Sequence, residues 1–345
     1  MKLCFISQDI AGSNIFEIIA RDAPRKFVSC THLAFGKPGA LDEQEVLKDV
    51  RFARATFLGM SSNEKLSRLE IEAGLAAYAA GQTVYLFADL PTSVCRPFYK
   101  KAFSNKAVQV LIPTEDVRAL ARRTFPKAKI HAVGNPWWES FCFSGADAGK
   151  MKNKLGLSSD ETFVLCAGTK SPMVNFPLFN DAILALQGLG MTSKIKIVLC
   201  LHGGDILEPR YYSEFAEFGR AIICPPGIAS TDLVRECELV IQCASTTGVA
   251  AAYAGKPVID YIQPLARSRL RVNGAYPWFL SKQGASFETG TLGDLKKITR
   301  LLLDRNSILF RTGLLMQEKH FPKIERKGEV LKNIFTIIDS NTPAL

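Results

Sequence analysis

Residues 239–262, LVIQCASTTGVAAAYAGKPVIDYI, carry the pattern that decides the fold. Two apolar runs, Leu239 to Cys243 and Pro257 to Ile262, have the length and composition of buried strands. Between them, hydroxyl side chains precede a run of small residues. This predicts a short helix that begins at Ser245 and ends at Gly255. A strand, a helix and a second strand in this order indicate a parallel β/α unit.

The same alternation continues along the chain. Short runs rich in Val, Ile, Phe and Cys are separated by helical segments, which favours parallel sheets covered by helices. One helix is predicted after Ser61 and Glu64, which match a capping box, and another from Thr114 to the residue before Pro126. The predicted strands are Leu3 to Ile6, Phe27 to Leu33, Thr56 to Leu58, Thr83 to Phe87, Val108 to Pro113, Ile130 to Val133, Phe163 to Ala167, Lys196 to Leu201, Ala221 to Cys224, Leu239 to Cys243 and Pro257 to Ile262.

The length of the chain predicts two domains, because 345 residues exceed what one hydrophobic core usually fills. The stretch FSGADAG, Phe143 to Gly149, is small and flexible and predicts a hinge. We therefore expect an N-terminal α/β domain over 1–142 and a C-terminal α/β domain over 143–325. A C-terminal helix over 326–345 is expected to pack back on the N-terminal domain.

The composition favours an intracellular protein with anionic partners. A formal net charge of +10 and a sequence pI of about 9.1 suit nucleotides, nucleic acid or an anionic membrane surface, although most basic residues are expected on a solvated surface. Nine cysteines, most of them in apolar runs and without CxxC spacing, predict core residues in a reducing compartment. The sequence shows neither a signal-peptide core nor a long apolar span, so we expect a cytoplasmic protein without a transmembrane segment.

Residues that directly follow strands are the candidates for chemistry, because ligands of open parallel sheets bind beyond the carboxyl ends of the strands. The N–H groups and hydroxyls around Ser245 suit a diphosphate, but Ser245 is equally well explained as the cap of its own helix. The turn that begins at Gly168 adds a cation and two hydroxyls after the first strand of the same half, which favours the phosphate interpretation. The predicted phosphate-binding residues are Gly168, Thr169, Lys170, Ser171, His202, Ser245, Thr246, Thr247, Gly248 and Arg267.

Arg267 belongs to a basic loop that follows Ile262. If this segment is extended, Arg267, Arg269 and Arg271 lie on one side and can neutralise phosphate; a solvated basic loop explains them equally well. His202 follows another strand and precedes two glycines, so it is a candidate to hydrogen-bond a base, ribose or phosphate.

The first half has two carboxylates at strand ends. Asp9 precedes a Gly turn into a helix and is a candidate general base toward an acceptor hydroxyl; its alternative role is an acidic helix cap. Asp89 is the second candidate catalytic carboxylate. The predicted acceptor-side residues are Gly12, Ser13, Arg96 and Lys100.

Several chemistries lack support in the sequence. The four histidines are far apart, and neither an HExxH motif nor a cluster of carboxylates is present, so we predict no metal site. A Walker A loop and a GxGxxG fingerprint are also missing, which argues against ATP hydrolysis and nicotinamide chemistry. We therefore expect no cofactor beyond a nucleotide-sugar co-substrate.

Three stretches resemble the GT-B superfamily, which contains nucleotide-sugar glycosyltransferases and non-hydrolysing UDP-N-acetylglucosamine 2-epimerases. Residues 129–136 look like the last strand of the first domain, 155–168 like the entry into the second, and 233–259 like the donor motif. The resemblance implies two tandem Rossmann-like domains with parallel sheets that face a central cleft. It also implies a UDP-linked donor bound by the second domain, an acceptor held by the first, and Asp9 as the base.

One departure from that pattern concerns the ribose. Many relatives carry a Glu a few residues after the Gly of the donor motif, whereas Val249 to Ala252 follow Gly248 here. Either another residue, such as His202 or Asp260, holds the ribose, or the ligand is not an ordinary nucleotide-sugar.

The leading functional prediction is a metal-independent glycosyltransferase that moves a sugar from a nucleotide-sugar to an acceptor that the sequence does not identify. Candidate acceptors are anionic: DNA, a glycan or a lipid-linked molecule. The first alternative is a phage-type transferase that modifies DNA, with phosphates tracked by Arg118, Arg122, Arg123, Lys127 and Lys129. A UDP-sugar 2-epimerase is the second, although the paired acidic and histidine positions of that family are not evident. A non-catalytic nucleotide-binding module is the third, and the missing Glu favours it.

Overall fold

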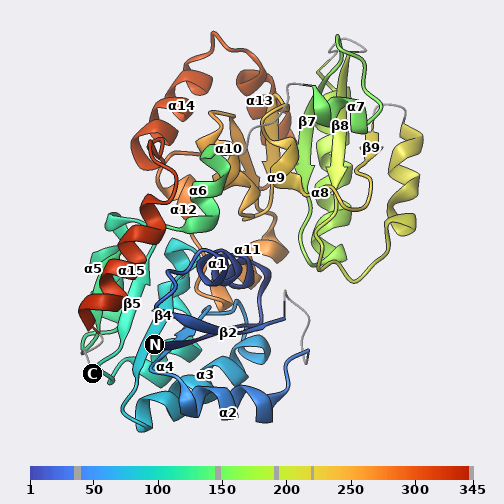
Figure 1. Ribbon diagram of the computed structural model, residues 1–345. Helices are drawn as coiled ribbons and strands as arrows, with labels where there is room; N and C mark the ends of the chain where they lie inside the picture. The colour runs from blue at the N-terminus through green and yellow to red at the C-terminus, as the bar shows by residue number, and fades with distance from the viewer. Residues whose placement is uncertain (35–39, 144–148, 190–193, 219–220, 342–345) are drawn as a thin grey trace. The chain divides into compact units, whose positions relative to one another are not determined.

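The computed structural model describes residues 1–34, 40–143, 149–189, 194–218 and 221–341 (Figure 1). The chain forms two compact units. Unit 1 comprises Met1–Ser140, Arg271–Tyr276 and Glu325–Leu345; unit 2 comprises Phe141–Leu270 and Pro277–Ile324. The hinge predicted over Phe143 to Gly149 falls mainly on 144–148, which lie outside the described residues.

Unit 1 is built on a six-stranded parallel sheet with the strand order β2-β1-β3-β4-β5-β6. Its strands are β1 (Lys2–Ser7), β2 (Val28–Leu33), β3 (Ala55–Leu58), β4 (Thr83–Phe87), β5 (Gln109–Ile112) and β6 (Lys129–Ala132). Its helices are α1 (Ile10–Arg21), α2 (Glu43–Phe52), α3 (Glu64–Ala79), α4 (Pro97–Phe103), α5 (Arg118–Thr124), the greater part of α6 (Pro136–Phe143) and α15 (Glu329–Asn341), with 3-10 helices over Pro91–Cys95 and Glu115–Val117. All the strands predicted for the first half are confirmed.

The unit 1 sheet is apolar on both faces, which is why its strands read as continuous hydrophobic runs. On one face, Cys4 and Leu86 pack with Val46 of α2 and Leu69 of α3. On the other, the Phe5 ring lies 5.3 Å from the ring of Phe16 in α1 and 4.8 Å from that of Phe57.

Helix α15 packs against unit 1 although it ends the chain. The Phe335 ring stacks on the Phe27 ring at 5.4 Å, and Lys26 pairs with Asp339 at 2.5 Å. The Val330 N–H donates to the Glu139 carboxylate at 3.2 Å. The C-terminal segment is therefore part of the core of unit 1.

Unit 2 has a second six-stranded parallel sheet, with the order β12-β11-β10-β7-β8-β9. Its strands are β7 (Thr162–Ala167), β8 (Ile195–Cys200), β9 (Ala221–Ile223), β10 (Leu239–Gln242), β11 (Val258–Tyr261) and β12 (Phe287–Thr289). Its helices are α7 (Lys150–Lys154), α8 (Pro172–Gln187), a 3-10 helix over Pro209–Phe218, α9 (Ser230–Leu233), α10 (Thr247–Tyr253), α11 (Pro264–Val272), which runs into Arg271 of unit 1, α12 (Phe279–Lys282), α13 (Leu292–Leu303) and α14 (Ile308–His320). The predicted strands of this half are confirmed; β12 was missed because its three residues alternate in polarity.

Two helix starts differ from the prediction. Helix α3 is capped by Asn63, whose side chain accepts the Leu66 N–H at 2.9 Å, and not by Ser61. The Ser61 hydroxyl instead donates to the Glu70 carboxylate. Burial of this carboxylate without hydrogen-bond donors would be more unfavourable than an uncapped helix end. The helix predicted from Thr114 begins as a 3-10 turn before α5.

None of the nine cysteines, all of which are among the described residues, takes part in a disulfide. Within the described ranges, every helix is too short or too polar to cross a bilayer.

Candidate functional site

The neighbouring strands β10, β7 and β8 end at one edge of the unit 2 sheet. Gln242 is in register with Ala167, and Ala167 with Cys200, so the three strands end level with one another. The turns that follow them carry Ser245, Gly168 and His202. The parallel topology therefore places these predicted phosphate-binding turns at one edge of the sheet.

The turn after β7 is held by Asn175 of α8, which the sequence analysis did not select. The buried Asn175 side chain accepts the Thr169 N–H at 2.6 Å and donates to the Thr169 carbonyl at 2.8 Å. Its amide also donates to Asp205 at 2.7 Å, and Tyr212 donates to the same carboxylate oxygen at 2.7 Å. This network fixes the backbone from Gly168 to Ser171 before any ligand arrives.

The turn after β10 differs in detail from the prediction. Helix α10 begins at Thr247, not at Ser245, and Ala244 takes the left-handed conformation with φ of 51°. The Ser245 hydroxyl accepts the Thr247 N–H at 3.3 Å. The N-cap residue of α10 is Thr246, so Ser245 contacts the start of the helix from one residue before the cap position.

Gly248 is needed for close packing. Its N–H donates to the Gln242 side chain at 2.8 Å, so this amide is already satisfied. A Cβ at Gly248 would lie 2.2 Å from Gln242 Nε2. The backbone N–H groups of Thr247 and Gly248 therefore serve the fold. The buried Thr247 hydroxyl also bonds the Ser230 hydroxyl at 2.6 Å, so the half-buried Ser245 and Thr246 hydroxyls remain as phosphate candidates.

Asp260 is not available to a ribose, contrary to one expectation. The residue is fully buried, and its carboxylate accepts Gln242 Nε2 at 2.8 Å and the Ser286 hydroxyl. Burial raises the pKa of Asp260 to about 7. Asp260 holds Gln242, and Gln242 in turn holds the start of α10.

His202 is oriented by its own turn. Nδ1 accepts the Gly204 N–H at 2.9 Å, so a neutral ring carries its proton on Nε2. His202 is half-buried, as are Thr169 and Lys170. Of the two residues suggested for the ribose, only His202 is partly open to solvent.

The arginines after β11 lie on α11 and not on an extended loop, which corrects the expectation that they share one side. Arg267 pairs with Glu288 at 3.2 Å. Arg269 Nη1 donates to the Ser171 hydroxyl at 2.6 Å, so it reaches the turn after β7. Arg271 belongs to unit 1, where its guanidinium lies 5.0 Å from the centre of the Tyr276 ring. Arg269 is therefore the arginine that contacts a predicted phosphate turn.

In unit 1, Asp9 is the N-cap of α1. Its Oδ1 accepts the Ile10 N–H at 2.9 Å and its Oδ2 accepts the Ser62 N–H at 3.1 Å. Both oxygens of this buried carboxylate are thus engaged by backbone donors. The structure gives Asp9 the capping role that was its alternative in the sequence.

Asp89 lies in a different environment. Its Oδ1 accepts the Ser93 hydroxyl at 2.5 Å and lies 3.3 Å from Arg96 Nη2. Burial raises the pKa of Asp89, Arg96 and Ser93 lower it, and the nearby Asp9 carboxylate adds to the rise. Among the described residues, no donor contacts Oδ2, and no acceptor contacts the buried Arg96 Nη1.

Glu70 of α3 is a buried carboxylate that sequence reasoning missed, since it reads as a polar position on a surface helix. Oε1 accepts the Gln8 N–H at 2.8 Å and the Ser61 hydroxyl, and Oε2 accepts the Ser61 N–H at 3.2 Å and the Tyr99 hydroxyl. Burial raises the pKa of Glu70 to about 7 against these four donors. Gln8 adjoins Asp9, so Glu70 fixes the chain that presents Asp9.

The other predicted acceptor-side residues have simpler surroundings. Ser13 is fully buried, with its hydroxyl 3.4 Å from the Ser7 carbonyl, and a Cβ at Gly12 would lie 2.4 Å from Ser7 Oγ. These two residues pack α1 on β1 instead of facing an acceptor. Lys100 is exposed on α4.

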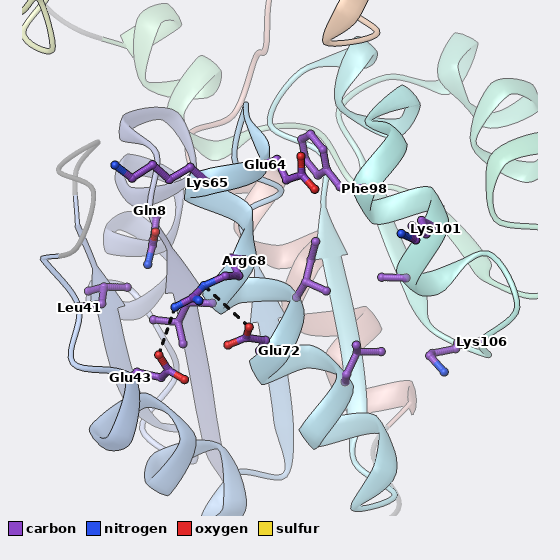
Figure 2. A pocket seen from close by; sticks show the side chains of 14 residues that line it. Gln8, Leu41, Glu43, Glu64, Lys65, Arg68, Glu72, Phe98, Lys101 and Lys106 are labelled. Carbon is purple, nitrogen blue, oxygen red and sulfur yellow. Dashed lines mark hydrogen bonds and ion pairs between the residues drawn. The ribbon is translucent and has the colours of Figure 1, made fainter.

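A hollow of about 1010 Å³ lies over α3, and Gln8 is among the residues that line it (Figure 2). Arg68 lies between Glu43 and Glu72, at 3.4 and 3.8 Å, and Lys101 and Lys106 line another part. Acidic and basic groups alternate around it, so it favours neither an anion nor a cation.

Two parallel α/β units with these strand orders define the class: the chain has the GT-B fold, as the resemblance implied. No family model and no curated protein matches the sequence. Among solved structures, the chain is similar to S. aureus MnaA with UDP (TM-score 0.69, 12% identity, 99% of each chain). It is also similar to the UDP-GlcNAc 2-epimerase from Neisseria meningitidis bound to UDP-GlcNAc (TM-score 0.66, 12% identity, 99% of this chain and 100% of that chain). The wall teichoic acid polymerase TagF matches with a TM-score of 0.57, 13% identity, and 99% and 88% coverage.

Proposed function

We propose that this chain is an enzyme that binds a UDP-linked sugar through unit 2 and transfers the sugar to an acceptor hydroxyl. The observation that carries the proposal is the contact between Arg269 and Ser171. It brings a guanidinium to the turn after β7, beside the turns after β8 and β10. An arginine with convergent hydroxyls at strand ends suits a diphosphate. Solved proteins of the same fold were crystallised with UDP or UDP-GlcNAc, which supports the choice of nucleotide.

In the proposed reaction the acceptor oxygen attacks the anomeric carbon of the sugar. The bond from that carbon to the β-phosphate oxygen breaks, and UDP leaves with the electron pair. Arg269 and Lys170 are the cations that would balance the charge on the leaving diphosphate. The acceptor proton passes to a carboxylate, for which Asp89 is the better candidate because its pKa is raised and its Oδ2 accepts no bond from a described residue.

An anionic acceptor is part of the proposal. Arg96 is buried, and its Nη1 contacts no acceptor among the described residues, so one side of the guanidinium is left without a partner. A buried charged donor without a partner is unfavourable. An anionic group on the acceptor would satisfy it.

Epimerisation at C2 is a second candidate. Two results of the structure comparison support it. The match to the Neisseria enzyme covers 99% of this chain and 100% of that chain, and its TM-score exceeds that of TagF. Both candidates break the same bond to the diphosphate, so the proposed UDP site serves either reaction.

The binding half of the proposal is tested by calorimetry with UDP. Arg269→Ala should weaken UDP binding by about tenfold or more, because a charge-assisted hydrogen bond contributes about 1.5–3 kcal/mol. Arg122→Ala, an exposed arginine on α5, is the matched control and should bind UDP like the unchanged protein. Equal affinities for both variants, or no UDP binding at all, would remove the proposed site.

The catalytic half is tested by incubating the protein with UDP-GlcNAc. Release of UDP that depends on an added acceptor indicates transfer, whereas conversion to the C2 epimer with no net UDP release indicates epimerisation. Asp89→Asn should abolish turnover and leave UDP affinity unchanged. Tight UDP binding without turnover of any UDP-sugar would identify a non-catalytic binding module, and a requirement for duplex DNA as acceptor would identify a DNA-modifying transferase.

A further inference from the structure

Two cysteines and a histidine meet in unit 1 away from the proposed reaction site. Cys4 lies on β1, and Cys30 and His32 lie on the edge strand β2. The parallel register pairs Cys4 with Cys30 and Ile6 with His32, so the three side chains share one face of the sheet. Their sulfur and nitrogen atoms all lie within 4.8 Å of one another.

The histidine of this cluster is held by a carboxylate. Asp49 of α2 contacts His32 Nε2 through Oδ2 at 3.1 Å, while its Oδ1 accepts Lys2 Nζ at 2.7 Å. With Nε2 engaged, Nδ1 is the nitrogen left for a ligand. A carboxylate on the far nitrogen is the arrangement that orients metal-binding histidines in proteins.

We propose that Cys4 Sγ, Cys30 Sγ and His32 Nδ1 bind a zinc ion, with Asp49 orienting the imidazole. Two thiolates and an imidazole prefer zinc to the hard cations magnesium and calcium. Around a tetrahedral zinc such ligand atoms lie about 3.5–3.8 Å apart, so the cluster needs only small side-chain rotations. A water molecule would complete the tetrahedral coordination.

When the zinc ion binds, each of the two cysteine thiols releases one proton, so the two thiolate charges balance the charge of the ion. The Cys30 thiol now donates to the Leu3 carbonyl at 3.3 Å, and the zinc bond would replace this contact. The ion would join the edge strand β2 to β1 through side chains, next to α2 that carries Asp49. The ion would therefore link two strands of unit 1, and its site does not involve the nucleotide turns in unit 2.

The test uses the full-length protein, reduced, freed of metal with a chelator and titrated with Co²⁺ and then Zn²⁺. We expect one Co²⁺ per chain, with a thiolate-to-cobalt charge-transfer band and the visible absorption of tetrahedral cobalt, both removed by Zn²⁺. Cys30→Ser and His32→Gln should each abolish this spectrum, and Asp49→Asn should lower the affinity about 10–100-fold. These positions avoid the fully buried Cys4, and circular dichroism verifies the fold.

Cys224→Ser is the matched control, since Cys224 and Cys200 form a thiol pair in unit 2 that is not joined by a histidine among the described residues. This variant should keep the full cobalt spectrum. A spectrum without a thiolate band, one that survives both Cys30→Ser and His32→Gln, or one that Cys224→Ser removes, would overturn the proposal.

Discussion

Replacing Gly248 by alanine should destabilise unit 2, because the glycine allows Gln242 to lie against the start of α10. An added Cβ would be 2.2 Å from Gln242 Nε2 and 2.8 Å from Leu280 Cδ1. Both side chains are fully buried, and the shorter contact is with Gln242 Nε2, so the amide of Gln242 has to move. Its displacement would break the 2.8 Å hydrogen bond from Nε2 to Asp260.

The size of the effect follows from these two contacts. Overpacking a filled core costs about 1–3 kcal/mol, and loss of a hydrogen bond to a charged group about 1.5–3 kcal/mol. Because movement of Gln242 relieves the clash while it breaks the bond, the two amounts overlap. We expect a loss of about 2–4 kcal/mol, a large share of the 5–15 kcal/mol that stabilises a typical domain.

Native-state hydrogen exchange of the β10 and α10 amides measures this loss within unit 2. Gly203→Ala is the matched control, because a Cβ at this exposed glycine would meet nothing within 4 Å. It should change exchange by less than about 0.5 kcal/mol. A Gly248→Ala protein as stable as Gly203→Ala would refute the argument that Gln242 is wedged between Gly248 and Asp260.

Two further predictions concern buried carboxylates. Asp260 and Glu70 have pKa values of about 7, whereas in the unfolded chain they titrate near 3.8 and 4.5. The native state therefore holds more protons between about pH 4 and pH 7, so the free energy of unfolding should fall as the pH rises through this window, by on the order of 3 kcal/mol per group. Denaturant titrations at a series of pH values should show that the unfolding free energy of Asp260→Asn falls less steeply with rising pH than that of the unchanged protein. An equal dependence on pH would argue against the raised pKa of Asp260. Glu70→Gln should destabilise unit 1 by about 1–3 kcal/mol, since whichever oxygen becomes NH₂ faces the Gln8 or Ser61 N–H; a thermal-shift assay that finds no loss would contradict this pairing.

The strands were predictable because parallel strands that are buried on both faces consist of continuous runs of apolar residues. The register of Cys4 with Cys30 was not, because the two cysteines are 26 residues apart and only strand pairing brings them together. The search for CxxC or HExxH spacing could not detect such a site. A Cys-x-His pair on one apolar run, with a cysteine on its neighbour, is the signal that would have indicated it.

The turns at strand ends were predicted, but their internal hydrogen bonds were not. Sequence position identified Gly168 and Ser245, whereas the side chains that fix these turns, Asn175 and Gln242, lie in a helix and a strand where they read as ordinary polar residues. Arg269 shows the same limit. In an extended segment, Arg267, Arg269 and Arg271 would lie on one side. In a helix, residues two apart lie on different sides, and Pro264 begins a helix here.

Glu70 and Asp89, which are two of the buried carboxylates of unit 1, suit different roles because their oxygens are occupied differently. Each oxygen of Glu70 accepts two donors from the chain, so neither oxygen is left to contact a substrate. Asp89 takes its contacts from Ser93 and Arg96 on Oδ1. Its Oδ2 accepts no bond from a described residue and can take up a proton. Glu70 is therefore expected to act as a positioning residue whose loss leaves the pH profile of turnover unchanged, whereas Asp89→Asn should remove turnover itself.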